Sequence, residues 1–220
     1  AYFNYNSGAS YTDPYRKITR SGDNLEQVIL SQIATAKKSI YVAVQELRLP
    51  LVAKALAAKK AQGVDVRVVL EHNYNFTVVN QRDRGDNEHE ATRLTELVAL
   101  IDTNRDGRAS KAELEAGDAV YILNAAKIPV IDDASDGSSG SGLMHHKFMI
   151  VDGKSVLVSS ANFTLSCIHG DILAPATRGN ANSIIVMNST AAADIFTEEF
   201  GQLWGNGKRG NFGHSKTYRG

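Results

Sequence analysis

The stretch HHKFMIVDGKSVLVSSAN, residues 145–162, carries reactive side chains at both ends of two apolar runs. His145 and Lys147 are one residue apart, so their side chains would share one face of an extended strand. Ser160 and Asn162 repeat this spacing after the second run. If the two runs pair as a hairpin, one end of the sheet presents an imidazole, an ammonium, a hydroxyl and an amide together.

This set of groups suits a phosphate ester. A lysine supplies a fixed positive charge, and serine and asparagine donate hydrogen bonds to phosphate oxygens. A histidine can attack phosphorus or transfer a proton near neutral pH. A polar strand edge with two hydrogen-bonded histidines fits the same spacing, so the residues alone leave both interpretations open.

The elements that must position these groups alternate between helix and strand patterns. Residues 23–39 begin with Asp23, a candidate helix cap, and continue with apolar residues at helical spacing. The strand patterns SIYVAVQE (39–46) and VDVRVVLE (64–71) lie on either side of a helix pattern that ends at Gly63. Such alternation predicts an α/β fold with at least partly parallel strands.

The second half of the chain continues this alternation. A helix and a strand are predicted in residues 119–131, and a loop rich in Gly, Ser and Asp follows at 132–142. The runs KFMIV and SVLVSS predict two strands joined by a tight turn at Asp152 and Gly153. A last strand (182–188) and a closing amphipathic helix (189–204) complete one domain that spans residues 1–220.

Residues 145–162 resemble the signature of the phospholipase D superfamily, H-x-K-x4-D-x6-G-S-x-N. The matching residues are His145, Lys147, Asp152, Ser160 and Asn162, whereas Ser159 stands where the family has glycine. The similarity extends over the flanking helix and strand patterns, and it is greatest to the small bacterial nuclease branch. It implies a phospholipase D-like mixed sheet flanked by helices.

The resemblance also implies roles for the motif residues. His145 would be the nucleophile that forms a phosphohistidine, while Lys147 and Asn162 would hold the phosphate oxygens and Ser160 would assist. Asp152 would support the site without taking part directly. The motif occurs once in this chain, which implies a homodimer in which two copies of the motif meet at a twofold axis. No metal is expected for catalysis.

The acid that orients the histidine in many family members is missing here. Ala181 stands in its place, so Glu46 is the first candidate for this role and Asp171 the second. His146 is an alternative nucleophile, but its spacing to Lys147 does not match the signature.

Residues 74–118 interrupt the α/β pattern and predict a helical insertion. Within it, IDTNRDGRASKAE contains D-x-N-x-D-G-x5-E, which resembles the calcium loop of an EF-hand. The expected Ca²⁺ ligands are oxygens of alternating residues, with Arg108 contributing its carbonyl: Asp102, Asn104, Asp106, Arg108, Ser110 and Glu113. We expect a structural rather than a catalytic ion.

The amino-acid composition limits which binding partners and which cellular locations we expect for this protein. The net charge is zero, so a polyanion would have to bind local basic patches, for which the candidates are the C-terminal tail and Arg16, Lys17 and Arg20. One cysteine excludes an intrachain disulfide, and no apolar run has the length of a membrane span. A calcium site of this kind suits an exported protein, so we expect secretion or a periplasmic location.

The leading functional hypothesis is a metal-independent nuclease that cleaves DNA, with RNA as a further substrate. Two alternatives remain open at this point. One is a lipid-directed phosphodiesterase or phosphatidyl transferase with the same chemistry. The other is an inactive calcium-binding scaffold.

Overall fold

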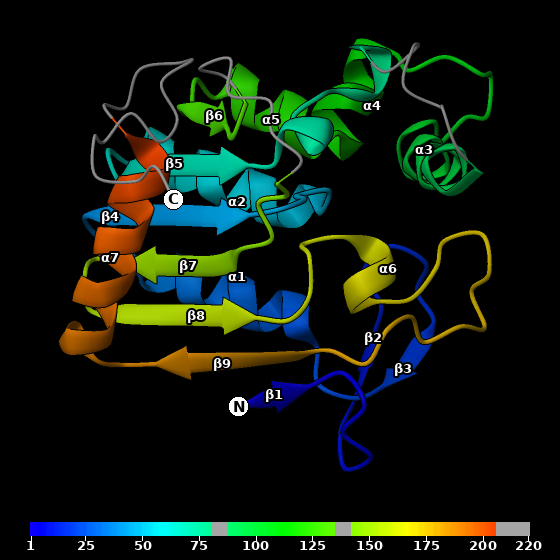
Figure 1. Cartoon of the computed structure of the whole chain (residues 1–220). Helices are drawn as coiled ribbons and strands as arrows, with labels where there is room; N and C mark the ends of the chain where they lie inside the picture. Colours follow the sequence, from blue (N-terminus) through cyan, green and yellow to red (C-terminus); the bar gives the residue numbers. More distant parts are fainter. Residues whose placement is uncertain (81–87, 135–141, 206–220) are drawn as a thin grey trace.

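A mixed seven-stranded sheet forms the centre of the molecule (Figure 1). The computed structural model describes residues 1–80, 88–134 and 142–205. Within these ranges the strand order is β1-β9-β8-β7-β4-β5-β6. The strands are β1 (Tyr2–Phe3), β4 (Ser39–Val44), β5 (Asp65–Leu70), β6 (Val130–Asp132), β7 (Lys147–Val151), β8 (Ser155–Ser159) and β9 (Ser183–Met187).

The parallel and antiparallel parts of the sheet follow the sequence prediction. β4, β5 and β6 are parallel, as the intervening helix patterns predict, and β7 lies antiparallel to β4. β7 and β8 form the predicted hairpin, in which Asp152 and Gly153 take positive φ values of 55° and 61°. Two consecutive left-handed residues are typical of the tight turns that join hairpin strands. The expected α/β fold class is therefore confirmed.

Helices cover both faces of the sheet. The helices are α1 (Leu25–Thr35), α2 (Pro50–Ala61), α3 (Glu88–Ile101), α4 (Lys111–Gly117), α5 (Ala119–Ala125), α6 (Leu165–Ile168) and α7 (Thr190–Trp204), with 3-10 turns η1 (His72–Tyr74) and η2 (Val78–Asn80). Side chains of α1, α2 and α5 share one buried cluster with one face of the sheet. α7, which matches the predicted amphipathic helix, covers the opposite face, where its apolar residues Ala193, Phe200 and Trp204 are buried and Phe196 packs beside them.

The N-terminal segment differs from the sequence analysis in two respects. It contributes the edge strand β1 and a separate hairpin of β2 (Ser10–Thr12) and β3 (Thr19–Ser21), neither of which was predicted. The cap of α1 is Asn24, whose side chain accepts from the Gln27 amide, whereas Asp23 accepts from the amides of Phe3 and Asn6. Asp23 therefore ties the N-terminus to α1 and does not cap the helix.

Candidate active site

His145 and Lys147 lie at the start of β7, at the same edge of the sheet where β4 and β8 end. His145 lies two residues before the first residue of β7 and its side chain is exposed, whereas Lys147 is buried at 7 % exposure. The Lys147 ammonium donates to the His145 carbonyl at 2.9 Å and to Gln45 Oε1 at 3.1 Å. The structure thus places the exposed imidazole of His145 beside the buried ammonium of Lys147, which two hydrogen bonds fix in position.

The charge of Lys147 acts on this imidazole. The positive charge, assisted by burial and by His146, lowers the pKa of His145 from its ordinary value. The lowered pKa favours the neutral ring, whose unprotonated nitrogen can act as the attacking group. Burial likewise lowers the pKa of Lys147, while Cys167 and Glu46 oppose this effect.

Asn162 joins the same cluster after β8. Its Nδ2 group donates to Gln45 Oε1 at 3.2 Å, so Gln45 connects the asparagine and the lysine of the motif. Asn162 Oδ1 is buried and has no hydrogen-bond partner among the described residues. The sequence analysis did not identify Gln45 as a site residue. The feature that could have indicated it is a polar side chain directly after the mostly apolar strand β4.

The Ser160 hydroxyl, which the resemblance assigns to the phosphate site beside Asn162, bonds residues at the start of β9 in this structure. Its hydroxyl donates to Asn182 Oδ1 at 2.9 Å and accepts from the Ser183 amide at 2.9 Å. Strand alternation does not continue past Ser159, because the chain leaves β8 there to connect to β9. In this structure Ser160 anchors the start of β9.

Asp152 lies at the far end of β7 from Lys147. Five strand residues separate the two ends, which corresponds to roughly 16 Å. The Asp152 carboxylate accepts hydrogen bonds from the backbone amides of Lys37, Lys38 and Ser39 at 2.7–3.2 Å. It therefore fixes the connection between α1 and β4, and the structure places it outside the active site.

Glu46 and His146 have partners of their own. Glu46 is 5 % exposed, and its carboxylate accepts from Arg48 Nε at 3.3 Å. It also raises the pKa of Lys147, which places its charge near the site. His146 bonds Glu199 of α7 at 2.9 Å, on the opposite face of the sheet, which agrees with His145 as the motif histidine.

Comparison with known proteins gives the family. Residues 29–204 match the family model described as "Cardiolipin synthase, PLD-like domain", which covers well over half of the chain. The chain belongs to the phospholipase D superfamily. This is a superfamily of phosphodiesterases, in agreement with the resemblance of the motif.

Two curated relatives share only about a quarter of their aligned residues with this chain. A mitochondrial cardiolipin hydrolase of Xenopus tropicalis is 25 % identical over 176 residues, which cover 80 % of this chain and 59 % of that protein. A phospholipase D of Rickettsia bellii is 26 % identical over 172 residues, 78 % of this chain and 60 % of that protein. The chain thus spans about three fifths of the length of these curated relatives.

Two solved structures align with most of this chain at TM-scores just below 0.5. The family member Nuc from Salmonella typhimurium aligns with a TM-score of 0.49 and 28 % identity, over 81 % of this chain and 86 % of that one. NucT from Helicobacter pylori aligns with a TM-score of 0.47 and 13 % identity, over 87 % and 91 % of the two chains.

The two arginines of the predicted N-terminal basic surface are engaged within the fold, whereas Lys17 is exposed. Arg16 pairs with Asp13 and donates to the carbonyls of Asp171 and His169. Arg20 is 7 % exposed and donates to the Thr177 carbonyl. Both guanidinium groups tie the N-terminal hairpin to the loop after α6. The basic C-terminal tail lies outside the described residues.

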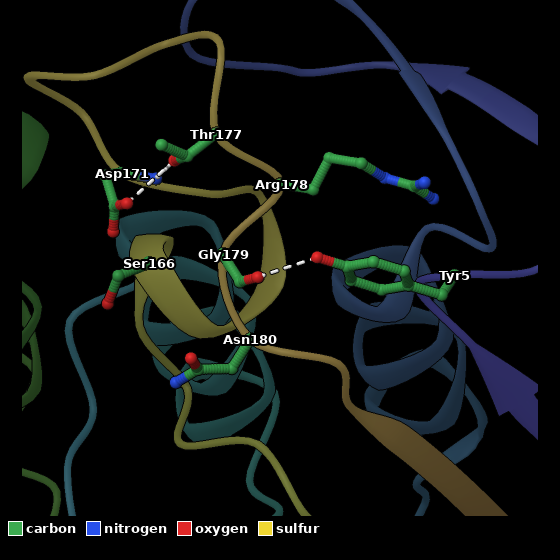
Figure 2. A pocket seen from close by; sticks show the side chains of 7 residues that line it. All are labelled: Tyr5, Ser166, Asp171, Thr177, Arg178, Gly179 and Asn180. Atoms are coloured by element: carbon green, nitrogen blue, oxygen red, sulfur yellow. Dashed lines mark hydrogen bonds between the residues drawn. The ribbon is translucent and has the colours of Figure 1, made fainter.

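A polar pocket of about 400 Å³ opens in the connection between β8 and β9, the same connection that begins with Ser160 and Asn162 (Figure 2). Its lining consists of Tyr5, Ser166, Asp171, Thr177, Arg178, Gly179 and Asn180. Asp171, the second candidate for orienting the histidine, accepts from the Thr177 hydroxyl at 2.7 Å. Tyr5 donates to the Gly179 carbonyl at 2.9 Å.

The predicted calcium loop runs from the end of α3 into the first turn of α4, where Glu113 lies, so the expected helix–loop–helix is present. Gly107 takes a φ of 78°, and Asp102 accepts from the amides of Asp106 and Gly107. Glu113 accepts from Thr103 and Asn104 with one oxygen and from Ser110 with the other.

These hydrogen bonds, those of Ser110 first, lower the pKa of Glu113 to about 2. Asn104 and Asp106 also bond each other, and the Asp106 carboxylate accepts from the Arg108 amide. Across the described ranges, three or more His, Cys, Asp or Glu side chains nowhere converge on a metal position. The calcium site remains a prediction from the sequence.

Proposed function

We propose that this chain is a phosphodiesterase that uses His145 as its nucleophile. The observation that carries this proposal is the exposed His145 imidazole beside the buried Lys147 ammonium, with Asn162 tied to the same Gln45 oxygen. A neutral imidazole next to a fixed cation is suited to attack phosphorus while the cation binds the phosphate oxygens.

The reaction follows from these groups in two displacements. A His145 ring nitrogen forms a bond to phosphorus, and the bond from phosphorus to the leaving oxygen breaks. The leaving oxygen takes a proton from a second His145, which starts in its protonated, imidazolium form and is supplied by another copy of this chain in a homodimer. That second imidazole then accepts a proton from water, whose oxygen displaces His145 from phosphorus and regenerates the enzyme. The homodimer is part of the proposal.

Nucleic acid is the substrate we favour. The residues directly after β5 lie beside the residues directly after β4, since the Glu71 amide donates to the Gln45 carbonyl at 3.2 Å. This neighbouring segment is polar and aromatic, with exposed His72 and Asn73 followed by half-buried Tyr74 and Asn75. Such groups stack on bases and donate to sugars and phosphates.

A lipid substrate is the second candidate. The curated relatives are named cardiolipin hydrolase and phospholipase D, and Leu143, two residues before His145, is 53 % exposed. An apolar side chain beside the nucleophile could contact acyl chains. No helix in the described part of the chain is long and apolar enough to cross a membrane.

One experiment separates these candidates. Purified protein and the His145→Ala variant are incubated in EDTA with plasmid DNA, single-stranded DNA, RNA and cardiolipin vesicles. If the unchanged protein cleaves a nucleic acid and the His145→Ala variant does not, the nuclease is supported. If the unchanged protein cleaves only cardiolipin, the second candidate is supported. Turnover that survives in His145→Ala overturns the mechanism for either substrate.

We also propose that the loop between α3 and α4 binds Ca²⁺ as a structural ion in an exported protein. The D-x-N-x-D-G-x5-E sequence and the left-handed Gly107 support this proposal. Binding would replace the present hydrogen bonds of Glu113 with bonds to the ion. Direct titration with Ca²⁺ in a calorimeter tests it, and the absence of a binding heat would refute it.

A further inference from the structure

Gln45 occupies the centre of the polar cluster but belongs to no part of the family signature. It follows the last residue of β4 and is 5 % exposed. Its backbone amide donates to the His146 carbonyl at 2.9 Å, and its carbonyl accepts from the Glu71 amide. Because both neighbouring strands hold its main chain, the side chain starts from a fixed point.

The side-chain oxygen of Gln45 is an acceptor for two motif residues. Lys147 Nζ lies 3.1 Å away and Asn162 Nδ2 lies 3.2 Å away. The two donors come from the start of β7 and from the segment after β8, 102 and 117 residues along the chain from Gln45. A single amide oxygen therefore fixes the relative positions of the two groups that would hold the phosphate.

The acceptor also has an electrostatic effect. Burial of Lys147 favours its neutral form, and an acceptor within hydrogen-bonding distance favours the ammonium form. The other titratable groups around this ammonium are Glu46 after β4, Cys167 on α6 and His145 in its own segment. Without Gln45 Oε1, the Lys147 ammonium would keep the His145 carbonyl as its hydrogen-bond acceptor within the described part of the chain.

We propose that Gln45 is a positioning residue of this site, whose side-chain oxygen holds Lys147 and Asn162 together so that both bind one phosphate group. This inference rests on the proposed phosphodiesterase function. Gln45 acts through its two partners and takes no part in bond making or breaking. It also explains why a neutral amide, with one strong acceptor and no charge, ends an otherwise apolar strand.

The test uses Gln45→Leu, which removes the acceptor at similar volume, and Gln45→Glu, which keeps an acceptor. Gln62→Leu makes the same change at an exposed position after α2 and is the matched control. Thermal melts first establish that each variant is folded. Steady-state kinetics on bis(p-nitrophenyl) phosphate are then measured across pH 5–10, and binding of inorganic phosphate is measured by calorimetry.

We expect Gln45→Leu to lower kcat/KM about ten- to hundredfold, the range for losing a hydrogen bond to a charged group. The alkaline limb of its pH profile should move to lower pH, because the pKa of Lys147 falls further. Phosphate should bind about tenfold or more weakly, and Gln45→Glu should recover part of both losses. Gln62→Leu should match the unchanged protein.

The inference is overturned if Gln45→Leu stays within twofold in kcat/KM and phosphate affinity. It is also overturned if activity falls only in proportion to a lost melting temperature, with an unshifted pH profile, because that result indicates a structural role. If the unchanged protein binds phosphate but cleaves no diester, the proposed function fails while the phosphate titration still decides the role of Gln45. If the unchanged protein neither binds phosphate nor cleaves the diester, both the proposed function and the role of Gln45 are overturned.

Discussion

Asp152 provides the sharpest test of the structural interpretation, because the resemblance implies a supporting role for this motif residue and the structure shows its carboxylate holding backbone amides at the far end of β7. Its carboxylate accepts from three backbone amides at the junction of α1 and β4. We expect Asp152→Asn to lower the stability of the fold and to leave the chemistry of the folded protein intact.

The magnitude follows from these hydrogen bonds. A hydrogen bond to a charged group contributes about 1.5–3 kcal/mol when water is excluded. The amides of Lys37 and Lys38 lie in exposed surroundings, so water competes and the contribution is smaller. Asparagine retains one acceptor oxygen and tolerates the left-handed backbone at this position, where φ is 55°. We therefore expect a loss of about 1.5 kcal/mol, which lowers Tm by about 3–6 °C in a chain of this size.

The loss should depend on pH in a defined direction. Burial raises the pKa of Asp152, but the amides of Ser39, Lys38 and Lys37 outweigh it, so the folded pKa lies below the ordinary value of 3.8. The stabilisation is therefore fully present above the pKa of the unfolded chain and is lost as the pH falls through the lower folded pKa. The Tm difference between the two proteins should be full at pH 7 and smaller at pH 3, and it should vanish only below the folded pKa.

The assay combines thermal melts at both pH values with steady-state kinetics at a temperature where both proteins are folded. We expect kcat of Asp152→Asn to remain within about threefold. A variant with unchanged Tm and a hundredfold lower kcat would refute the reasoning, because Asp152 would then act in catalysis. Asp152→Gly is the useful companion, since it removes the carboxylate and any strain from the positive φ together.

Further predictions concern the histidine, the dimer, the calcium loop and a buried pair. His145→Ala should abolish turnover and change Tm by less than about 1 °C, since the side chain is exposed; retained turnover would contradict the assignment. Because the charge of Lys147 lowers the pKa of His145 below 6.5 and attack needs the neutral ring, the acid limb of kcat/KM should lie below pH 6.5; a limb above it would be inconsistent. Sedimentation should show an active dimer, and an active monomer would exclude the shared site. If Ca²⁺ binds, EDTA should lower Tm without lowering activity, whereas Glu113→Gln, which keeps the side-chain size, should abolish the EDTA effect. Glu26 and His169 are bonded at 2.8 Å with no more than 1 % exposure, so Glu26→Ala should cost about 3 kcal/mol in chemical denaturation, and a near-neutral result would contradict a structural pair.

The sequence by itself determined the α/β class, the β7–β8 hairpin and the motif residues at its open end. These features depend on local patterns, namely apolar alternation, an Asp-Gly turn and spacing along one strand. The helix–loop–helix between α3 and α4 was likewise predictable from residues near one another in the chain. Local hydrogen bonding and periodicity are sufficient to specify such elements.

Only the tertiary structure decided which side chains meet. Gln45 contacts Lys147 and Asn162 because the strand order places β4 beside β7, and no local pattern encodes that adjacency. The same long-range packing turned Ser160 towards β9 and placed Asp152 on backbone amides more than a hundred residues away. It also buried Arg20, which the sequence presents as surface charge. Contacts across a sheet depend on strand order and register, and these are settled by burial of the whole core rather than by neighbouring residues.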